Sequence, residues 1–383
     1  MMIMRTDNDI VIAGIGLYPV GEHWEISLRT MGARAVRAAI ADSGGLQPHG
    51  LFVGNAFASI LSHQSNLAAL IADEAGLTGV EACSFEAAGA SGGAAVRAAY
   101  LAVKSGFLDC AVALGIEKIT ENTGTKAAET QDLMLNYEYE TTAGMTIPSG
   151  AALLARRYMV EYGLERDVLD CMSLNAYSQA CGNPNAFYHL RLNEEKLLHQ
   201  PLSNAPLGMF DCAALADGAA ALVITRADKL SEKFEHLPVR IIGSANAIAP
   251  LSLHDRRNLL HYGACAASAE KAFKHADIPQ RSVDIWEVWD AFSIDAILTR
   301  EAIGLAPSGE GWKADGRYYS SMGGCLGRGN PLGASGAYQV AEAALQIRGE
   351  AGACQIQNVR TAFVQCVGGL GGTAVTHILT NEE

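Results

Sequence analysis

The chain has 383 residues and a formal net charge of −13, with 49% hydrophobic and 18% charged residues. This composition predicts a globular protein with a large buried core. The length predicts two or three domains or an internal duplication, because single cores stop growing below this size. The net negative charge and the lack of any run of Lys or Arg disfavour nucleic acid and anionic membranes as partners, since both bind clustered positive charge.

The nine cysteines are scattered, with no CxxC pair and no cluster with histidines. This spacing indicates neither a metal site nor a disulfide framework, and it is typical of a reduced protein. The first nine residues contain no apolar stretch of signal-peptide length, and the alanine-rich segments are too short and interrupted to span a bilayer. We therefore expect a soluble, cytoplasmic protein.

The first part of the chain alternates predicted strands and helices. Apolar runs that end in turn residues indicate strands, and helical spacing of apolar residues indicates helices. The strands are predicted at residues 10–17, 50–53 and 110–114, and the helices at residues 27–43, 65–76 and 90–106. This alternation is typical of stacked α/β layers.

Residues 117–204 are more polar and resemble an insertion, after which a strand at 222–225 resumes the first half. We predict an N-terminal half of residues 1–117 and 206–238, a loop domain of residues 118–205, and a C-terminal half of residues 239–383.

The two halves contain the same short motif. A predicted alanine-rich helix begins at Ala90-Ser91-Gly92 and ends at Gly106, and a second begins at Ala334-Ser335-Gly336 and ends at Gly349. A buried strand follows each helix, the second at residues 362–366 before a glycine-rich turn. Two copies of one α/β unit explain this repetition.

Five motifs in order carry a resemblance to a known family. They are residues 86–93 (EAAGASGG), 217–223 (DGAAALV), 287–292 (EVWDAF), 329–336 (GNPLGASG) and 366–369 (CVGG). Each glycine-rich turn alone is a weak signal. Together they resemble the thiolases, especially the sterol-carrier-protein type, over nearly the whole chain.

The resemblance implies a duplicated five-layer α/β/α/β/α thiolase fold with a loop domain over the pocket, assembled as a homodimer or tetramer. It implies an acyl-CoA thioester substrate, in which coenzyme A is part of the substrate and no cofactor is covalently bound. In such enzymes a cysteine at a buried helix N-terminus is acylated, paired donors stabilise the thioester oxygen, and a second cysteine moves the α-proton.

The sequence departs from this pattern at three positions. Gly89 stands where the family carries its nucleophilic cysteine, and a glycine cannot form an acyl-enzyme. Trp289 and Asn330 stand where relatives have histidines. Because three positions differ together, we interpret Gly89 as natural divergence rather than as an engineered single change.

Other elements of the family's site are retained. Cys366 holds the position of the acid/base cysteine, although free cysteines are often only small core residues. The main-chain N–H groups of Gly89 and Gly368 correspond to the family's second oxyanion hole. The Asn330 amide can donate to a thioester oxygen, whereas Trp289 is expected to fill space more than to donate.

Three further assignments each have an alternative in which the residues have only a structural role. Tyr262 is a candidate acid or base, and the alternative is a packing tyrosine. A basic cluster at the ligand entrance would meet the coenzyme A phosphates, or would be a solvated helix face. Its members are Arg256, Arg257, Lys271 and Lys274. Cys83 is expected to be a buried structural thiol rather than a displaced nucleophile.

These residues favour an enzyme that cleaves or forms a carbon–carbon bond without an acyl-enzyme, with retro-aldol cleavage of a β-hydroxyacyl-CoA as the preferred reaction. The resemblance also implies a small partner protein with an OB fold or zinc ribbon. One alternative is a non-catalytic subunit that binds acyl-CoA or supports a thiolase complex. The other is an acetyl-CoA acetyltransferase whose nucleophile position is altered.

Overall fold

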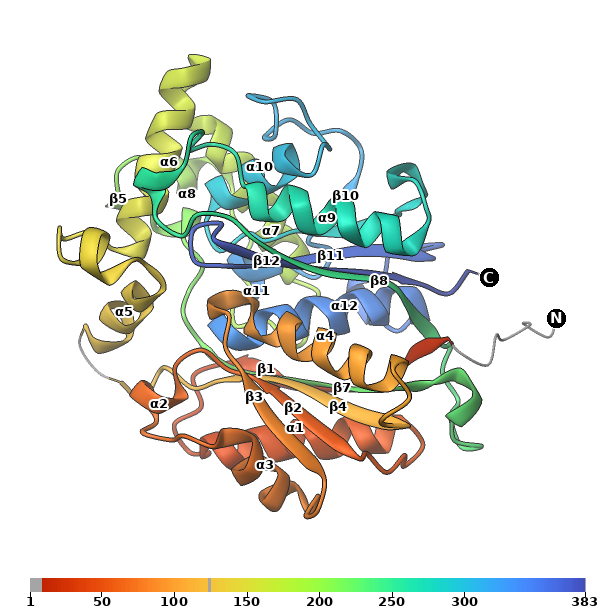
Figure 1. The fold of residues 1–383 in the computed structure, drawn as a ribbon. Helices are drawn as coiled ribbons and strands as arrows, with labels where there is room; N and C mark the ends of the chain where they lie inside the picture. Colours follow the sequence, from red (N-terminus) through yellow and green to blue (C-terminus); the bar gives the residue numbers. More distant parts are fainter. Residues whose placement is uncertain (1–8, 123–124, 383) are drawn as a thin grey trace.

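The computed structural model describes residues 9–122 and 125–382, and its strands form two similar halves (Figure 1). The N-terminal half contains β1 (Ile10–Gly21), β2 (Gly50–Gly54), β3 (Glu81–Phe85), β4 (Cys110–Glu117) and β7 (Asp217–Arg226). The C-terminal half contains β8 (Val239–Ile248), β9 (Ile285–Glu287), β10 (Tyr318–Tyr319), β11 (Thr361–Gly368) and β12 (Thr373–Thr380).

The two halves have the same strand order and the same directions. The order is β3-β2-β4-β7-β1 in the first half and β10-β9-β11-β12-β8 in the second. In each half the first two pairings are parallel and the last two are antiparallel. A short β1–β8 ladder joins the halves at one corner, so the strands form one continuous order of ten. This symmetry confirms the duplication predicted from the repeated motifs.

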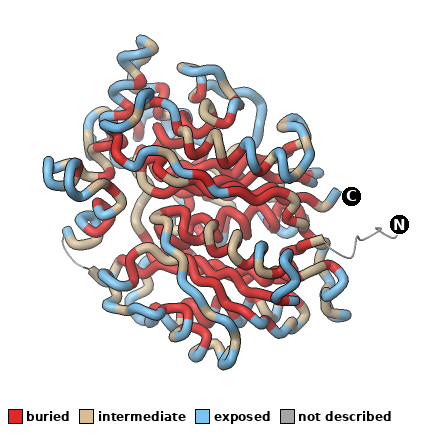
Figure 2. The backbone as a smooth tube through the Cα atoms, in the orientation of Figure 1, coloured by how far each residue is buried: buried red, intermediate tan, exposed pale blue. Residues whose placement is uncertain are grey.

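Helices pack in three layers around the two halves (Figure 1). The central layer is α4 (Ser91–Lys104) and α12 (Ser335–Arg348), which contact each other and both sets of strands. The outer layers include α1 (Leu28–Asp42), α2 (Ala58–Leu61) and α3 (Leu67–Ala75) below, and α9 (Gly263–Ala276) and α10 (Ser293–Ala302) above. Most of the long strands and the central helices are largely buried, whereas β3 and the outer helices are partly exposed (Figure 2). The five-layer α/β/α/β/α arrangement is therefore confirmed.

The segment between the halves is mostly helical. It contains α5 (Lys126–Gln131), α6 (Ile147–Tyr162), α7 (Asp167–Ala180) and α8 (Glu194–Leu198), followed by the hairpin of β5 (Leu202–Asn204) and β6 (Leu207–Gly208). The remaining helix, α11 (Gly324–Arg328), precedes Asn330. Whether residues 118–205 form a separate loop domain stays a prediction. No helix within the described residues is long and apolar enough to cross a bilayer.

Close approach of the two central helices explains why glycine recurs at their first turns. A Cβ atom on Gly92 would lie 2.7 Å from the main-chain nitrogen of Ala337, and one on Gly336 would lie 2.6 Å from that of Gly93. Any side chain there would separate the helix starts. The repeated Ala-Ser-Gly motif is thus a packing requirement of the duplicated fold.

The prediction that Cys83 is a buried thiol is wrong, because the residue is exposed. It lies on β3, an edge strand that, among residues 9–122 and 125–382, pairs on one side only, with β2. Side chains on an edge strand lack a neighbouring strand to cover them. No local pattern in the sequence marks β3 as an edge.

Candidate active site

The space beside Gly89 is occupied by Trp289. A Cβ atom on Gly89 would lie 2.6 Å from the ring atom Cη2 of Trp289 and 2.6 Å from the carbonyl oxygen of Val367. Trp289 is buried, and within the described residues its indole Nε1 has no hydrogen-bond partner. The tryptophan therefore fills the volume that a side chain at residue 89 would need, in agreement with the filling role expected from its bulk.

The backbone around Gly89 has an unusual conformation. Ala88 has a φ of 51°, which non-glycine residues adopt rarely, and its N–H donates to Glu86 at 2.6 Å. A 3₁₀ turn over Ala88–Ala90 then leads into α4. The start of α12 has the same feature: Leu332, the first residue of the 3₁₀ turn Leu332–Ala334, has a positive φ of 34°. Such strain tends to persist where a turn must hold main-chain groups in one orientation.

Gly368 adjoins this turn at the end of β11. A Cβ atom on Gly368 would lie 2.4 Å from the carbonyl oxygen of Ala87. The segments that carry Gly89 and Gly368, the predicted pair of main-chain donors, therefore lie in main-chain contact. Only glycine permits this approach at residue 368.

Cys366 lies two residues earlier on β11, between the two central helix starts. A Cβ atom on Gly93 would lie 2.2 Å from its sulfur, and one on Gly336 would lie 2.8 Å from it. Burial raises the pKa of the Cys366 thiol to about 12. The group is thus protonated at neutral pH, so it is chemically suited to give a proton rather than to take one.

Asn330 is buried in the loop between α11 and α12. The hydroxyl of Ser335 donates to its side-chain Oδ1 at 2.7 Å, and its own main-chain N–H donates to Ala214 at 2.8 Å. These bonds orient the amide and leave its NH₂ to donate elsewhere. An amide held in this way can stabilise an oxyanion, but it cannot transfer a proton as a histidine does.

Tyr262 is paired with a carboxylate that the sequence analysis did not single out. Its hydroxyl donates to Asp295 Oδ1 at 2.6 Å, and both side chains are buried. Burial raises the pKa of Asp295 to about 7 and holds the pKa of Tyr262 well above its usual 10. The tyrosine ring packs against the glycine-rich turn, since a Cβ on Gly371 would lie 2.9 Å from it. A carboxyl group with a pKa near 7 suits acid/base chemistry.

The predicted basic cluster divides into one half-buried and three exposed members. Arg256 donates through Nε, Nη1 and Nη2 to the carbonyl oxygens of Pro250, Leu370 and Leu251, at 3.0, 2.6 and 3.0 Å. Arg257, Lys271 and Lys274 are exposed. Arg256 therefore holds the glycine-rich turn in place, and a phosphate-binding role for the exposed members stays a prediction.

Four buried carboxyl groups make stability depend on pH. Burial raises the pKa of Glu117, Asp290, Asp295 and Glu342 to about 7, whereas unfolded acidic side chains titrate near pH 4. Between these values the folded chain binds more protons than the unfolded chain, so stability falls as pH rises. We expect the free energy of unfolding to decrease from pH 5 to pH 8, by at most about 1.4 kcal/mol per pH unit for each group.

Denaturant titrations at pH 5, 6, 7 and 8 measure this slope. Asp290→Asn should flatten part of it, because Asp290 is buried and accepts hydrogen bonds only from Cys325 N (2.6 Å) and Ser320 Oγ (3.4 Å) within the described residues. Stability that increases from pH 5 to pH 8 in the unmodified protein would contradict the expectation.

Comparison with known proteins agrees with this geometry. Residues 10–189 match the family described as thiolase, N-terminal domain, and residues 245–381 match the thiolase C-terminal domain-like family. Acetyl-CoA acetyltransferase of Methanothermobacter thermautotrophicus is 37% identical over 97% of this chain and 100% of its own length. Benzoylsuccinyl-CoA thiolase subunit BbsB of Thauera aromatica is 29% identical over 96% of each chain. The solved structure named Ltp2-ChsH2(DUF35) aldolase covers 97% of this chain and 98% of its own, with a TM-score of 0.83 and 23% identity.

The fold and the matched residues define a protein of the thiolase superfamily. The chain belongs to the thiolase family, with relatives named acetyl-CoA acetyltransferase.

Proposed function

We propose that this protein binds acyl-CoA thioesters and cleaves a β-hydroxyacyl-CoA by retro-aldol chemistry, without a cysteine acyl-enzyme. The observation that carries the proposal is the packing of Trp289 into the space beside Gly89. Covalent catalysis needs a nucleophile and room for its acyl group, and residue 89 offers neither. A retro-aldol reaction needs a proton acceptor and an enolate-stabilising site instead.

In the proposed reaction Asp295, in its ionised form, accepts the proton of the Tyr262 hydroxyl, to which it is hydrogen-bonded at 2.6 Å. The tyrosine oxygen simultaneously takes the proton of the substrate's β-hydroxyl. The electron pair of that O–H bond forms the carbonyl of the leaving ketone or aldehyde. The electron pair of the Cα–Cβ bond passes to the thioester, which becomes an enolate.

We assign enolate stabilisation to the main-chain N–H groups of Gly89 and Gly368 and to the amide of Asn330. The protonated thiol of Cys366 then supplies a proton to the enolate carbon, which yields a shortened acyl-CoA and leaves a thiolate. The proton that Asp295 received returns through solvent to this thiolate, so both groups are restored. A pKa of about 12 keeps the thiol protonated at neutral pH before the step. Coenzyme A takes part only as the carrier of the acyl group.

Conventional acyl transfer is the second candidate, because relatives that match the full length of this chain are named acetyl-CoA acetyltransferase. It would require a nucleophile at a position other than 89. Cys366 does not meet this requirement, since a thiol with a pKa of about 12 is almost entirely protonated at neutral pH and the nucleophile must be the thiolate.

The test is a mass-spectrometric assay of the purified protein with acetyl-CoA, acetoacetyl-CoA and branched β-hydroxyacyl-CoAs. We expect a ketone or aldehyde and a shorter acyl-CoA from the β-hydroxy substrates, and no increase in protein mass. An acylated protein would instead support the acyltransferase. Tight binding of the thioesters without turnover, with or without a partner protein, would leave a non-catalytic subunit as the function.

We also propose a homodimer and a small partner protein. Within the part of the chain that the structure describes, the edge strand β3 pairs only with β2 and exposes much of its length, which supports pairing with a second copy. A partner is supported by the aldolase structure, whose name joins two components. Light scattering of the protein alone and co-purification with the product of a neighbouring gene test the two assemblies separately.

A further inference from the structure

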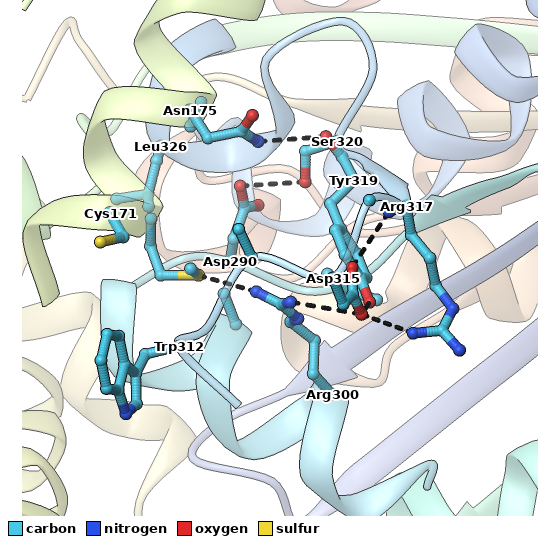
Figure 3. A pocket seen from close by; sticks show the side chains of 16 residues that line it. Cys171, Asn175, Asp290, Arg300, Trp312, Asp315, Arg317, Tyr319, Ser320 and Leu326 are labelled. Carbon is cyan, nitrogen blue, oxygen red and sulfur yellow. Dashed lines mark hydrogen bonds and ion pairs between the residues drawn. The ribbon is translucent and has the colours of Figure 1, made fainter. Parts of the chain in front are cut away.

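A cavity of about 480 Å³ lies between α7, α10 and the segment at residues 312–320 (Figure 3). None of the residues assigned to the proposed reaction lines it. Val288 and Asp290 do line it, whereas Trp289 between them packs against Gly89. The cavity therefore lies behind the candidate active site, across one segment of chain. Its volume is in the range of small-molecule sites.

One part of the lining is apolar. Trp312 contributes an aromatic ring, and the other apolar residues come from α7, α10, α11 and the segment after β9 (Figure 3). They are Met172, Ala176, Val288, Ala296 and Leu326, and Ala314 adds a methyl group from the segment at residues 312–320. A surface of this kind accepts a flat or branched apolar group rather than a sugar or a peptide backbone.

The opposite part carries two arginines and one carboxylate. Arg300 is 3% exposed, and its guanidinium stacks over Tyr319 at 4.0 Å. Its Nη1 donates to Met172 Sδ at 3.6 Å and its Nη2 to the carbonyl oxygen of Lys313 at 2.8 Å, whereas its Nε has no hydrogen-bond partner within the described part of the chain. Arg317 is the second cation. Both arginines share one carboxylate, Asp315, whose Oδ2 lies 3.6 Å from Arg300 Nη2 and 2.5 Å from Arg317 Nη1.

The other carboxyl group of the lining is Asp290. It is buried and accepts a hydrogen bond from the main-chain N–H of Cys325 at 2.6 Å, and burial raises its pKa to about 7, so it is only partly ionised at neutral pH. Asp315 accepts a further hydrogen bond from the Tyr319 hydroxyl at 2.7 Å, so its lone pairs are largely used. One incompletely paired, buried arginine beside an apolar wall matches an anionic head group on an apolar body.

We infer that this cavity is a binding site for a small organic carboxylate with an aromatic or branched apolar body, separate from the thioester site. The carboxylate meets Arg300 and Arg317, and the body lies on Trp312 and the apolar residues around it. The site goes beyond the proposed reaction, which uses none of these groups.

The experiment is isothermal titration of the full chain with 2-naphthoate, and with 2-naphthamide as the neutral analogue of the same shape. We expect 2-naphthoate to bind and 2-naphthamide to bind at least about tenfold more weakly, because it lacks the charge-assisted hydrogen bonds. Binding should persist in saturating coenzyme A. Equal affinity for the two probes, no binding of either, or displacement by coenzyme A would overturn the inference.

Two variants test the location. Arg317→Ala removes an exposed cation of the lining, and Ala296→Phe fills the cavity from α10; each should weaken 2-naphthoate about tenfold or more. Arg360→Ala is the matched control, since Arg360 is also an exposed arginine paired with a carboxylate, Glu382, and does not line the cavity. Thermal melting verifies that each variant is folded. If folded Arg317→Ala and Ala296→Phe bind as tightly as Arg360→Ala, the ligand lies elsewhere and the inference is wrong.

Discussion

Tyr262→Phe is expected to reduce the cleavage of a β-hydroxyacyl-CoA by about 10²- to 10⁴-fold, the usual contribution of a positioned acid or base. The substitution keeps the ring that packs on the glycine-rich turn and removes only the hydroxyl that donates to Asp295. Asp295→Asn should cause a loss of similar size, because an amide does not accept the proton. Steady-state kinetics with detection of the shortened acyl-CoA measure both.

Tyr158→Phe is the control for lost stability. Tyr158 is equally buried, and its hydroxyl also donates to a carboxylate, Glu301 Oε1, at 2.5 Å. Both phenylalanine variants lose one tyrosine–carboxylate hydrogen bond, worth about 1.5–3 kcal/mol of stability, but only Tyr262→Phe should lose activity. Equal losses of activity would show that the Tyr262–Asp295 pair is structural.

The pH profile gives an independent readout of the same pair. Because burial raises the pKa of Asp295 to about 7, the fraction of ionised base increases through neutral pH. We expect kcat/KM to rise with pH up to about this value and then to level off. A profile without this limb in the unmodified protein would exclude Asp295 as the base.

Gly89→Ala is expected to lower the free energy of unfolding by about 1–3 kcal/mol, the usual cost of overpacking a filled core. The new methyl group would lie 2.6 Å from both Trp289 Cη2 and the carbonyl oxygen of Val367. Trp289→Ala alone should cost about 3–5 kcal/mol, because it leaves a cavity. Denaturant unfolding of the single variants and the double variant measures the coupling between the two positions.

The double variant should lose about 0.5–3 kcal/mol less than the sum of the single losses, since removing the indole relieves one of the two clashes. The contact with Val367 remains, so the relief is partial. Gly263→Ala is the matched control: it also lies at a helix start, where a Cβ would meet only ordinary contacts at 3.7 Å or more. Strict additivity of Gly89→Ala and Trp289→Ala would mean that the ring does not fill this space in solution.

The layered fold was predictable because its signals are local and repeated. The alanine-rich helices that follow the two Ala-Ser-Gly motifs became α4 and α12, and the apolar runs became β4 and β11. Periodicity and glycine positions determine such elements within a few residues. The edge position of β3 was not predictable, because it depends on which strands pair across the sheet and left Cys83 exposed.

The candidate site was predictable only in part. The motif positions identified Gly89, Asn330 and Cys366, but Asp295 was missed because a single carboxylate near the start of an apolar helix is an ordinary feature of a sequence. The only feature of the sequence that pointed to a role for Asp295 was the position of this acidic residue among the apolar residues of α10. Arg256 was one candidate for a phosphate contact, with a solvated helix face as the alternative. The contacts of its guanidinium with three main-chain carbonyls depend on the path of the glycine-rich turn, which the sequence does not specify.

The sequence by itself determined the duplicated α/β architecture and the absence of any side chain at residue 89, since these follow from local patterns and from residue identity. Only the tertiary structure decided that Trp289 fills the vacant space, that Tyr262 meets Asp295, and that a separate cavity lies behind Trp289. Burial and contact join residues that are far apart in the chain. They also set the pKa values and the space available for a substrate, which no local pattern encodes.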